Sequence, residues 1–149
     1  MCRTVNRGTL LLLAGLLAGP HTARAQSCTV VVTPMNFGSY SPFVSTATDS
    51  AGRVTASCSG SGGYAVAIGP GTHSGNSFAD RRMWNGQSYL SYQLYANAAH
   101  TTIWGDGSAG TVTMPLTRSG TLSLYGRIPP RQSVTIGNYS DTVLVTILY

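Results

Sequence analysis

The chain has 149 residues, of which 42% are hydrophobic and only 9% charged. This length is enough for one domain with a single core. Its nine basic residues are all arginine and, against four aspartates, give a net charge of +5. The arginines are scattered, so the sequence lacks the dense basic patch of a phosphate-binding surface, and we expect no nucleic-acid partner.

Residues 1–25 have the pattern of a secretory signal peptide. A basic start containing Arg3 and Arg7 precedes a short apolar run at 10–18, and residues 23–25 read Ala-Arg-Ala, a small-residue cleavage signal. The run is shorter than the roughly 20 residues with which a helix crosses a bilayer. No longer apolar run follows, so we predict a secreted protein without a membrane span.

Cleavage after Ala25 leaves a mature domain of residues 26–149 with a net charge of +2 and two cysteines, Cys28 and Cys58. A disulfide between them is expected in an oxidising compartment and would stabilise the fold by roughly 3–4 kcal/mol in the chain-entropy model. A lipid anchor on Cys28 is disfavoured, because Gln26 and Ser27 do not resemble the small-residue approach to such a site. A metal-binding or reactive thiol pair is disfavoured too, because histidines and acidic residues are missing at ligand spacing.

Short β-rich runs separated by turn signals dominate the mature sequence, and no stretch has the pattern of an amphipathic helix. The expected strands, in chain order, are 28–33, 53–58, 64–69, 89–96, 111–115, 121–126, 133–136 and 141–149. Turn residues such as Asn85-Gly86 and Asp106-Gly107 tolerate the positive φ of tight turns. This spacing is typical of an all-β Greek-key sandwich of the immunoglobulin type.

The last nine residues alternate with the two-residue period of a strand. One face would carry Val143, Val145, Ile147 and Tyr149, and the other Thr142, Leu144, Thr146 and Leu148. An apolar strand of this kind either lies centrally in a sheet or offers an open edge to another chain.

Candidate catalytic residues are sparse. His73 and His100 have no carboxylate near them in the sequence, and Gly71-Thr-His-Ser-Gly75 lacks the spacing and the strand-to-helix elbow of a hydrolase nucleophile motif. A triad assembled by folding stays open. Four scattered aspartates disfavour a glycosidase carboxylate pair and a calcium loop. We predict no enzymatic activity, catalytic residue, metal or cofactor.

Two adjacent arginines, Arg81 and Arg82, could bind an anion. The simpler interpretation is a solvated strand end, or ion pairs with Asp80 and Asp106.

A series of short motifs follows one order along the mature sequence. They are Cys28-Thr-Val, Asn36-Phe-Gly-Ser-Tyr40, Gly52-Arg-Val-Thr-Ala-Ser-Cys58, Tyr64-Ala-Val-Ala-Ile68, Arg82-Met83, Leu90-Ser-Tyr-Gln-Leu-Tyr95, Ile103-Trp-Gly-Asp-Gly107, Tyr125-Gly-Arg-Ile-Pro129 and Gly137-Asn-Tyr-Ser-Asp-Thr-Val-Leu-Val-Thr146. Together they resemble the spore coat protein U domain family, which includes a coat protein of bacterial spores and subunits of archaic chaperone–usher pili.

The resemblance implies an incomplete immunoglobulin-like Greek-key sandwich that lacks its final strand, with a hydrophobic groove beside the last strand. Val143, Val145, Ile147 and Tyr149, or the opposite face, would help to line this groove. It also implies partners: a periplasmic chaperone fills the groove first, and a strand from a neighbouring subunit replaces it during assembly through an outer-membrane usher at the cell surface. Such β-augmentation combines main-chain hydrogen bonds with pockets for alternate side chains.

Polymerising members carry an alternating apolar donor segment before the first strand, where the predicted mature chain has only Gln26 and Ser27. We therefore expect a terminal or tip-like structural or adhesive subunit that accepts a strand and donates none. The alternative is a self-contained secreted binding module, whose loops 69–84 or 96–110 recognise a glycan or a surface.

Overall fold

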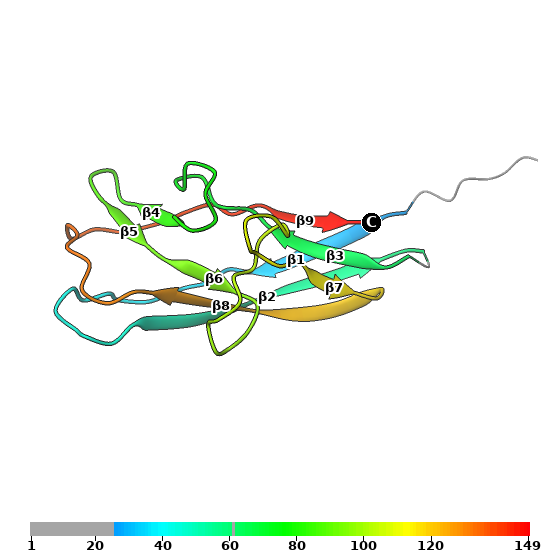
Figure 1. The fold of residues 1–149 in the computed structure, drawn as a ribbon, viewed down its shortest axis with the longest axis horizontal. Helices are drawn as coiled ribbons and strands as arrows, with labels where there is room; N and C mark the ends of the chain where they lie inside the picture. The colour runs from blue at the N-terminus through cyan, green and yellow to red at the C-terminus, as the bar shows by residue number, and fades with distance from the viewer. Residues whose placement is uncertain (1–25, 61) are drawn as a thin grey trace, which may run out of the picture.

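The computed structural model describes residues 26–60 and 62–149 (Figure 1). The predicted signal peptide, residues 1–25, lies outside the described residues. Strands but no helices are assigned in this part of the chain. They are β1 (Cys28–Thr33), β2 (Thr48–Cys58), β3 (Tyr64–Ile68), β4 (Arg82–Trp84), β5 (Tyr89–Ser91), β6 (Gln93–Tyr95), β7 (Met114–Leu116), β8 (Ser119–Ile128) and β9 (Val145–Leu148).

The strands form two main sheets that face each other, and every pairing between these strands is antiparallel. One sheet has the order β1-β2-β8-β6, the other has the order β7-β3-β9, and β4 and β5 form a separate hairpin. Buried side chains such as Val54 and Ile128 from the first sheet and Val66 and Ile68 from the second form the core between them. The predicted all-β sandwich is confirmed.

The long β2–β8 ladder shows how the sequence selects the two faces of the first sheet. In β2, Val54 and Ala56 are buried, while Thr55 and Ser57 are exposed. On the outer face Thr55 and Thr121 lie directly opposite each other, and their hydroxyl oxygens are 2.9 Å apart. A pleated strand directs successive side chains to opposite faces, so alternation of apolar and hydroxyl residues fixes which face is inside.

Several strand predictions differ from the structure. The strand predicted at 111–115 is observed as Met114–Leu116, and the one predicted at 141–149 is observed only as Val145–Leu148. The strand predicted at 53–58 begins earlier, at Thr48. The one predicted at 89–96 is divided at Tyr92, where the chain leaves the β4–β5 hairpin and joins the first sheet. Residues 133–136 form a loop, because Thr135 bonds to side chains such as Ser88 and not to a strand partner. The short strand β4 has too few residues to show a period, and the sequence does not predict it.

Arg81 is fully buried and connects the two sheets. Its guanidinium donates to Gln93 Oε1 at 2.7 Å and to the carbonyl oxygens of Gly69 at 2.7 Å and Trp104 at 2.8 Å. Desolvation lowers the pKa of Arg81 to about 10, so it remains a cation at neutral pH. The expectation of a solvated arginine, or of one paired with Asp80 or Asp106, is wrong for Arg81: carbonyl oxygens accept hydrogen bonds from its two terminal nitrogens instead.

The predicted disulfide is present. Cys28 and Cys58 are opposite each other in the β1–β2 ladder, with an S–S distance of 2.03 Å. The bond attaches the start of β1 to the end of β2.

Candidate functional site

Two edge strands, β1 and β9, border the open side of the sandwich (Figure 1). In the described part of the chain, β1 pairs only with β2 and β9 only with β3. Val32 points inward, since it lies opposite the buried Val54, yet 42% of it is exposed. An inward-facing apolar residue is exposed here because no strand covers it.

Backbone groups along the edge of β9 face the gap between β1 and β9, which we call the groove. Gly69 N donates to Leu144 O at 2.8 Å and Thr72 N donates to Thr142 O at 3.1 Å, so these carbonyls point toward the β3 side. Bonding direction alternates along an extended strand. The N–H and C=O groups of Val143 and Val145 therefore point into the groove and are available to a further strand.

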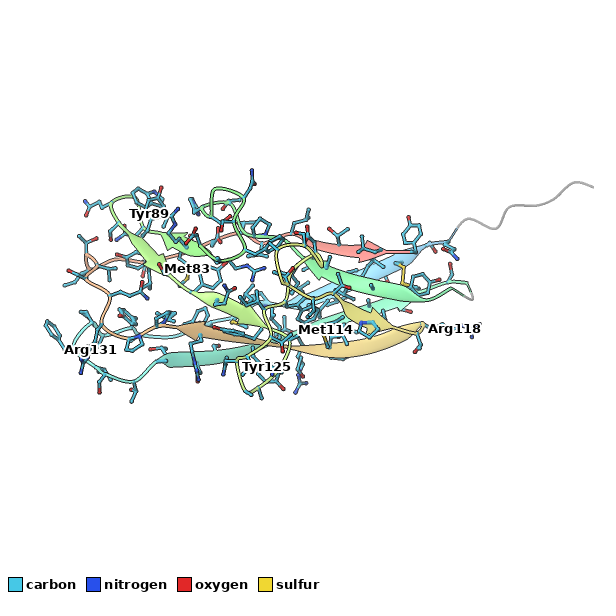
Figure 2. All side chains as sticks on the ribbon, viewed as in Figure 1. Met83, Tyr89, Met114, Arg118, Tyr125 and Arg131 are labelled. Carbon is cyan, nitrogen blue, oxygen red and sulfur yellow. A yellow bond between two sulfur atoms is a disulfide. The ribbon has the colours of Figure 1, made fainter. Side chains whose placement is uncertain are left out.

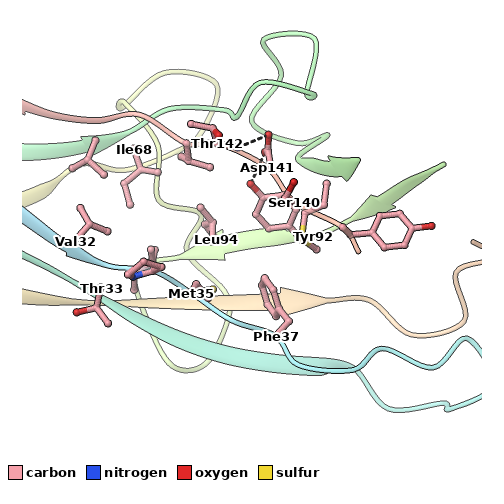
Figure 3. A pocket seen from close by; sticks show the side chains of 16 residues that line it. Val32, Thr33, Met35, Phe37, Ile68, Tyr92, Leu94, Ser140, Asp141 and Thr142 are labelled. Carbon is pink, nitrogen blue, oxygen red and sulfur yellow. Dashed lines mark hydrogen bonds between the residues drawn. The ribbon is translucent and has the colours of Figure 1, made fainter. Parts of the chain in front are cut away.

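A cavity of about 470 Å³ extends from the groove into the core (Figure 3). It is lined mainly by apolar side chains of both sheets and of the segments that follow β1 and precede β9. They are Val32, Thr33, Pro34, Met35, Phe37, Ile68, Met83, Tyr92, Leu94, Leu124, Tyr139, Ser140, Asp141, Thr142, Val143 and Val145. Protein interiors are normally close-packed, so this volume is room for another molecule's side chains.

Asp141 forms a polar wall of this cavity, and its side chain is only 2% exposed. Its carboxylate accepts a hydrogen bond from Tyr92 OH at 2.7 Å (Figure 3). It also accepts hydrogen bonds from Thr72 N at 3.0 Å and Thr72 Oγ1 at 2.6 Å, and His73 Nδ1 is 3.1 Å away. Gly71, at φ +93°, allows this approach, because a Cβ at that position would collide with the carboxylate. The segment before β9 is thus fixed to the loop after β3.

These contacts determine the protonation states of Asp141 and Tyr92. Burial would raise the pKa of Asp141, but hydrogen bonds from Thr72, Tyr92 and His73 outweigh it and hold the pKa below its ordinary value. Burial, followed by the bond to Asp141, raises the pKa of Tyr92 well above its ordinary range. At neutral pH the aspartate is therefore an acceptor and the tyrosine a donor.

The expectation that neither histidine has a carboxylate partner holds only for the linear sequence. Folding places His73 Nδ1 3.1 Å from Asp141 Oδ1, and His100 Nε2 3.9 Å from Asp49 Oδ1. In a hydrolytic triad the carboxylate and the nucleophile contact opposite ring nitrogens. Here Thr72 Oγ1 is 3.2 Å from the same Nδ1 that contacts Asp141, so this constellation is not a triad.

The predicted groove residues occupy different positions. Val143 and Val145 line the cavity, and Ile147 packs against the core farther along β9. Tyr149 follows β9, is 76% exposed, and has its ring centroid 6.4 Å from that of Tyr64. Leu144, from the opposite face, is 72% exposed and points away from the core.

Sequence reasoning did not identify the opposite wall, to which Val32, Met35 and Phe37 contribute, or the cavity floor at Leu94 and Leu124. The position of Val32 in a predicted strand could have indicated its inward direction. Nothing in the sequence distinguishes Leu94 and Leu124 from ordinary core leucines. They border the cavity because, in the described residues, no strand lies between β1 and β9.

In the described residues, no three His, Cys, Asp or Glu side chains lie close enough together to hold a metal ion. No helix in that same part of the chain is long and apolar enough to cross a membrane.

The architecture is that of an all-β, immunoglobulin-like sandwich. A chain in the crystal structure of the CsuC–CsuE chaperone–tip adhesion subunit pre-assembly complex, from the archaic chaperone–usher Csu pili of Acinetobacter baumannii, has the same fold. The TM-score is 0.59 and the identity 20%, over 84% of this chain and 40% of that one.

The sequence identifies the family. The Spore Coat Protein U domain profile matches residues 16–146. Protein U of Myxococcus xanthus is 32% identical over an alignment of 127 positions, which covers 77% of this chain and 71% of that protein. The chain belongs to the Spore Coat Protein U domain family.

Proposed function

We propose that this protein is a non-enzymatic subunit of a surface coat or pilus, and that it accepts a β-strand from another polypeptide between β1 and β9. The observation that carries this proposal is the cavity, which opens into the core between two unpaired strand edges. A donated strand would hydrogen-bond to the free edge of β9 and insert alternate side chains into the cavity. Strand and side chains together would complete the sandwich.

The proposed partners are a periplasmic chaperone, an outer-membrane usher and neighbouring subunits. Membership of the Spore Coat Protein U domain family supports a role in surface assembly. The similar fold found in a chaperone–tip adhesion subunit complex supports a chaperone as the first occupant of the groove. In this proposal the signal peptide at 1–25 directs the chain through the inner membrane, and the mature protein passes the periplasm on its way to the cell surface.

We also propose a terminal position in the assembly, which rests on the predicted cleavage after Ala25. The next two residues precede β1, and Ser27 is attached to the domain by hydrogen bonds between its N–H and hydroxyl groups and Ser59 Oγ. These residues are therefore poorly suited to extend into a neighbour. N-terminal sequencing of the secreted protein tests the cleavage site.

Expression in the periplasm with and without a fused donor strand tests strand acceptance. We expect the chain alone to be aggregated or degraded, because its core is exposed at the cavity. An alternating apolar strand attached after Tyr149 through a flexible linker should restore soluble protein, and a control strand with serine at the apolar positions should not. A stable monomer of the unfused chain, unaffected by either strand, would contradict the proposal.

A second candidate function is binding to an apolar surface. Phe43 and Ile136 are almost fully exposed. They belong to the loops that follow β1 and β8, which lie at the end of the sandwich opposite the C-terminus (Figure 1). Tyr40 OH accepts a hydrogen bond from Gln132 N at 2.6 Å, which holds the two loops together. These loops differ from 69–84 and 96–110, which the sequence suggested for this role.

A further inference from the structure

Two aromatic rings and a cation share one face of the β4–β5 hairpin (Figure 1). Trp84 lies directly opposite Tyr89 in the antiparallel register, and Arg82 is two residues before Trp84, so the three side chains point the same way. The other face, with Met83 and Leu90, is buried. Tyr89, labelled in Figure 2, is 45% exposed, and Arg82 and Trp84 are half-buried. We call Arg82, Trp84 and Tyr89 the aromatic face.

The side chains of the aromatic face contact one another. The ring centroids of Trp84 and Tyr89 are 4.3 Å apart, and Arg82 Cζ lies 4.9 Å from the centroid of the Tyr89 ring. The ring of His73, from the loop after β3, lies 6.3 Å from that of Tyr89. A guanidinium stacked on a ring is held in a fixed orientation, while its N–H groups point outward in its own plane.

No charge in the described part of the chain compensates that of Arg82. The ion pairs there involve His73, His100 and Arg127, and Nε of Arg82 is buried without a hydrogen-bond partner. The neighbouring Arg81, by contrast, donates to a side chain and to carbonyl oxygens. A half-buried guanidinium has lost part of its hydration, so an anion that accepts hydrogen bonds from it is favoured.

The backbone edges of the hairpin are already occupied beside these side chains. On the β4 edge, Trp84 N donates to Ser140 O at 2.9 Å, and Ser140 N donates to Trp84 O at 3.2 Å. On the β5 edge, Ser91 N donates to Gln132 Oε1 at 2.8 Å, and Gln132 Nε2 donates to Ser91 O at 2.9 Å. A ligand of the aromatic face must therefore be recognised by side chains and not by added main-chain pairing.

An acidic sugar matches these features. The C–H groups of a pyranose ring pack against an aromatic ring, and its hydroxyl groups remain in water. A uronic acid adds a carboxylate to the same ring, which a planar guanidinium can bind with two parallel hydrogen bonds. An acidic peptide would use the cation but leave the exposed rings without a partner. The six arginines and four aspartates of the mature domain also favour a polyanion.

We propose that the aromatic face binds acidic polysaccharides, with Trp84 and Tyr89 stacked against the sugar rings and Arg82 bound to their carboxylates. None of these three residues lines the cavity. The proposal is therefore independent of strand acceptance, and failure of either leaves the other intact.

Oligomers of galacturonate, alginate and hyaluronan test the proposal. Each is titrated into the mature protein, unfused or with the fused donor strand, whichever is soluble. Tryptophan fluorescence reports binding at Trp84, because the second tryptophan, Trp104, is fully buried. We expect at least one oligomer to bind. Its methyl ester, which has the same rings without the charge, should bind at least about tenfold more weakly.

Four variants assign the roles. Arg82→Gln should weaken binding of the acid about tenfold and remove the difference between acid and ester. Arg53→Gln, which removes an exposed arginine from β2, should change binding by less than about twofold. Tyr89→Ser should weaken binding of both acid and ester at least about fivefold, whereas Tyr89→Phe, which retains the ring, should stay within about twofold of wild type. Circular dichroism checks that each variant folds.

Three results would overturn the proposal. One is the absence of binding by all three oligomers. Another is an equal loss in Arg82→Gln and Arg53→Gln, which would mean that overall charge attracts the ligand. The third is binding of polyglutamate as tightly as the sugar and without any effect of Tyr89→Ser, which would mean that the face recognises acidic peptides.

Discussion

Asp141 shows how a single residue organises the site. Its partners Thr72 and His73 precede it in the sequence by 69 and 68 residues, yet together with Tyr92 they fix the approach to β9. A buried carboxylate is tolerated only when its oxygens are hydrogen-bonded. The residue therefore holds the groove wall in place before any partner arrives.

Asp141→Asn should destabilise the strand-complemented domain by about 2–4 kcal/mol at neutral pH, because an amide presents a donor where Thr72 or Tyr92 also donates. The folded-state pKa of Asp141 is lowered, so its charge stabilises the fold above its ordinary pKa, and this contribution is lost as the pH falls through the folded-state value. The difference between wild type and variant should therefore shrink below about pH 4. Urea unfolding of the strand-complemented protein across pH measures this.

The matched control is Asp80→Asn, which removes a carboxylate from an exposed position. It should change the unfolding free energy by less than about 0.5 kcal/mol. If the two variants behaved alike, or if the effect of Asp141→Asn were independent of pH, the ionised carboxylate of Asp141 would not be what holds the segment before β9 in place.

At the scale of elements, strands with a clear period can be predicted and short ones cannot. The predicted bounds of β1 match those observed, and the predicted ends of β3 and β8 lie within two residues. The two-residue period needs several residues to appear, so the sequence does not indicate β4 or the division at Tyr92. These features arise from contacts between distant segments, such as the hydrogen bond from Tyr92 N to Arg81 O.

The same limit applies to the candidate site. The alternation at the end of the chain indicates Val143 and Val145, both of which line the cavity. The cavity itself could not be predicted, because its floor at Leu94 and Leu124 is formed only when the two sheets face each other. The buried role of Arg81 is hidden for a related reason, since its acceptors include carbonyl oxygens, which every residue has.

The disulfide should matter most for the edge strand β1. Replacing Cys28 and Cys58 together by serine should cost about 3–4 kcal/mol in the chain-entropy model. Because β1 is paired on one side only, its amide hydrogens should exchange faster in this variant, while those of the central β2–β8 ladder should change less. Hydrogen-exchange mass spectrometry of the strand-complemented protein measures both regions.

Ser57→Ala provides a control in the same ladder, since it removes only an exposed hydroxyl contact with Ser119. It should leave the exchange of β1 nearly unchanged. Equal acceleration in β1 and in the central ladder of the cysteine variant would show that the disulfide stabilises the domain as a whole and has no particular effect on the groove wall.

At the scale of the whole molecule, the two candidate functions belong to different parts: the groove runs along the side between β1 and β9, and the exposed loops lie at one end. The C-terminus and the disulfide lie at one end of the sandwich, and the loops that follow β1 and β8, which carry Phe43 and Ile136, lie at the other (Figures 1 and 2). A subunit attached to its neighbours through the groove would leave these loops free to meet a surface. The two functions can therefore coexist and can be tested separately.

Replacing Phe43 and Ile136 by serine should reduce adsorption of the protein to an apolar bead several-fold. Both side chains are almost fully exposed, so the unfolding free energy should change by less than about 0.5 kcal/mol, and rescue by the fused donor strand should be unaffected. Ser45→Ala and Ser133→Ala, in the same two loops, are the control. Unchanged adsorption of the Phe43 and Ile136 variant would eliminate the surface-binding candidate, whereas a loss of rescue by the donor strand would mean that these loops and the groove are coupled.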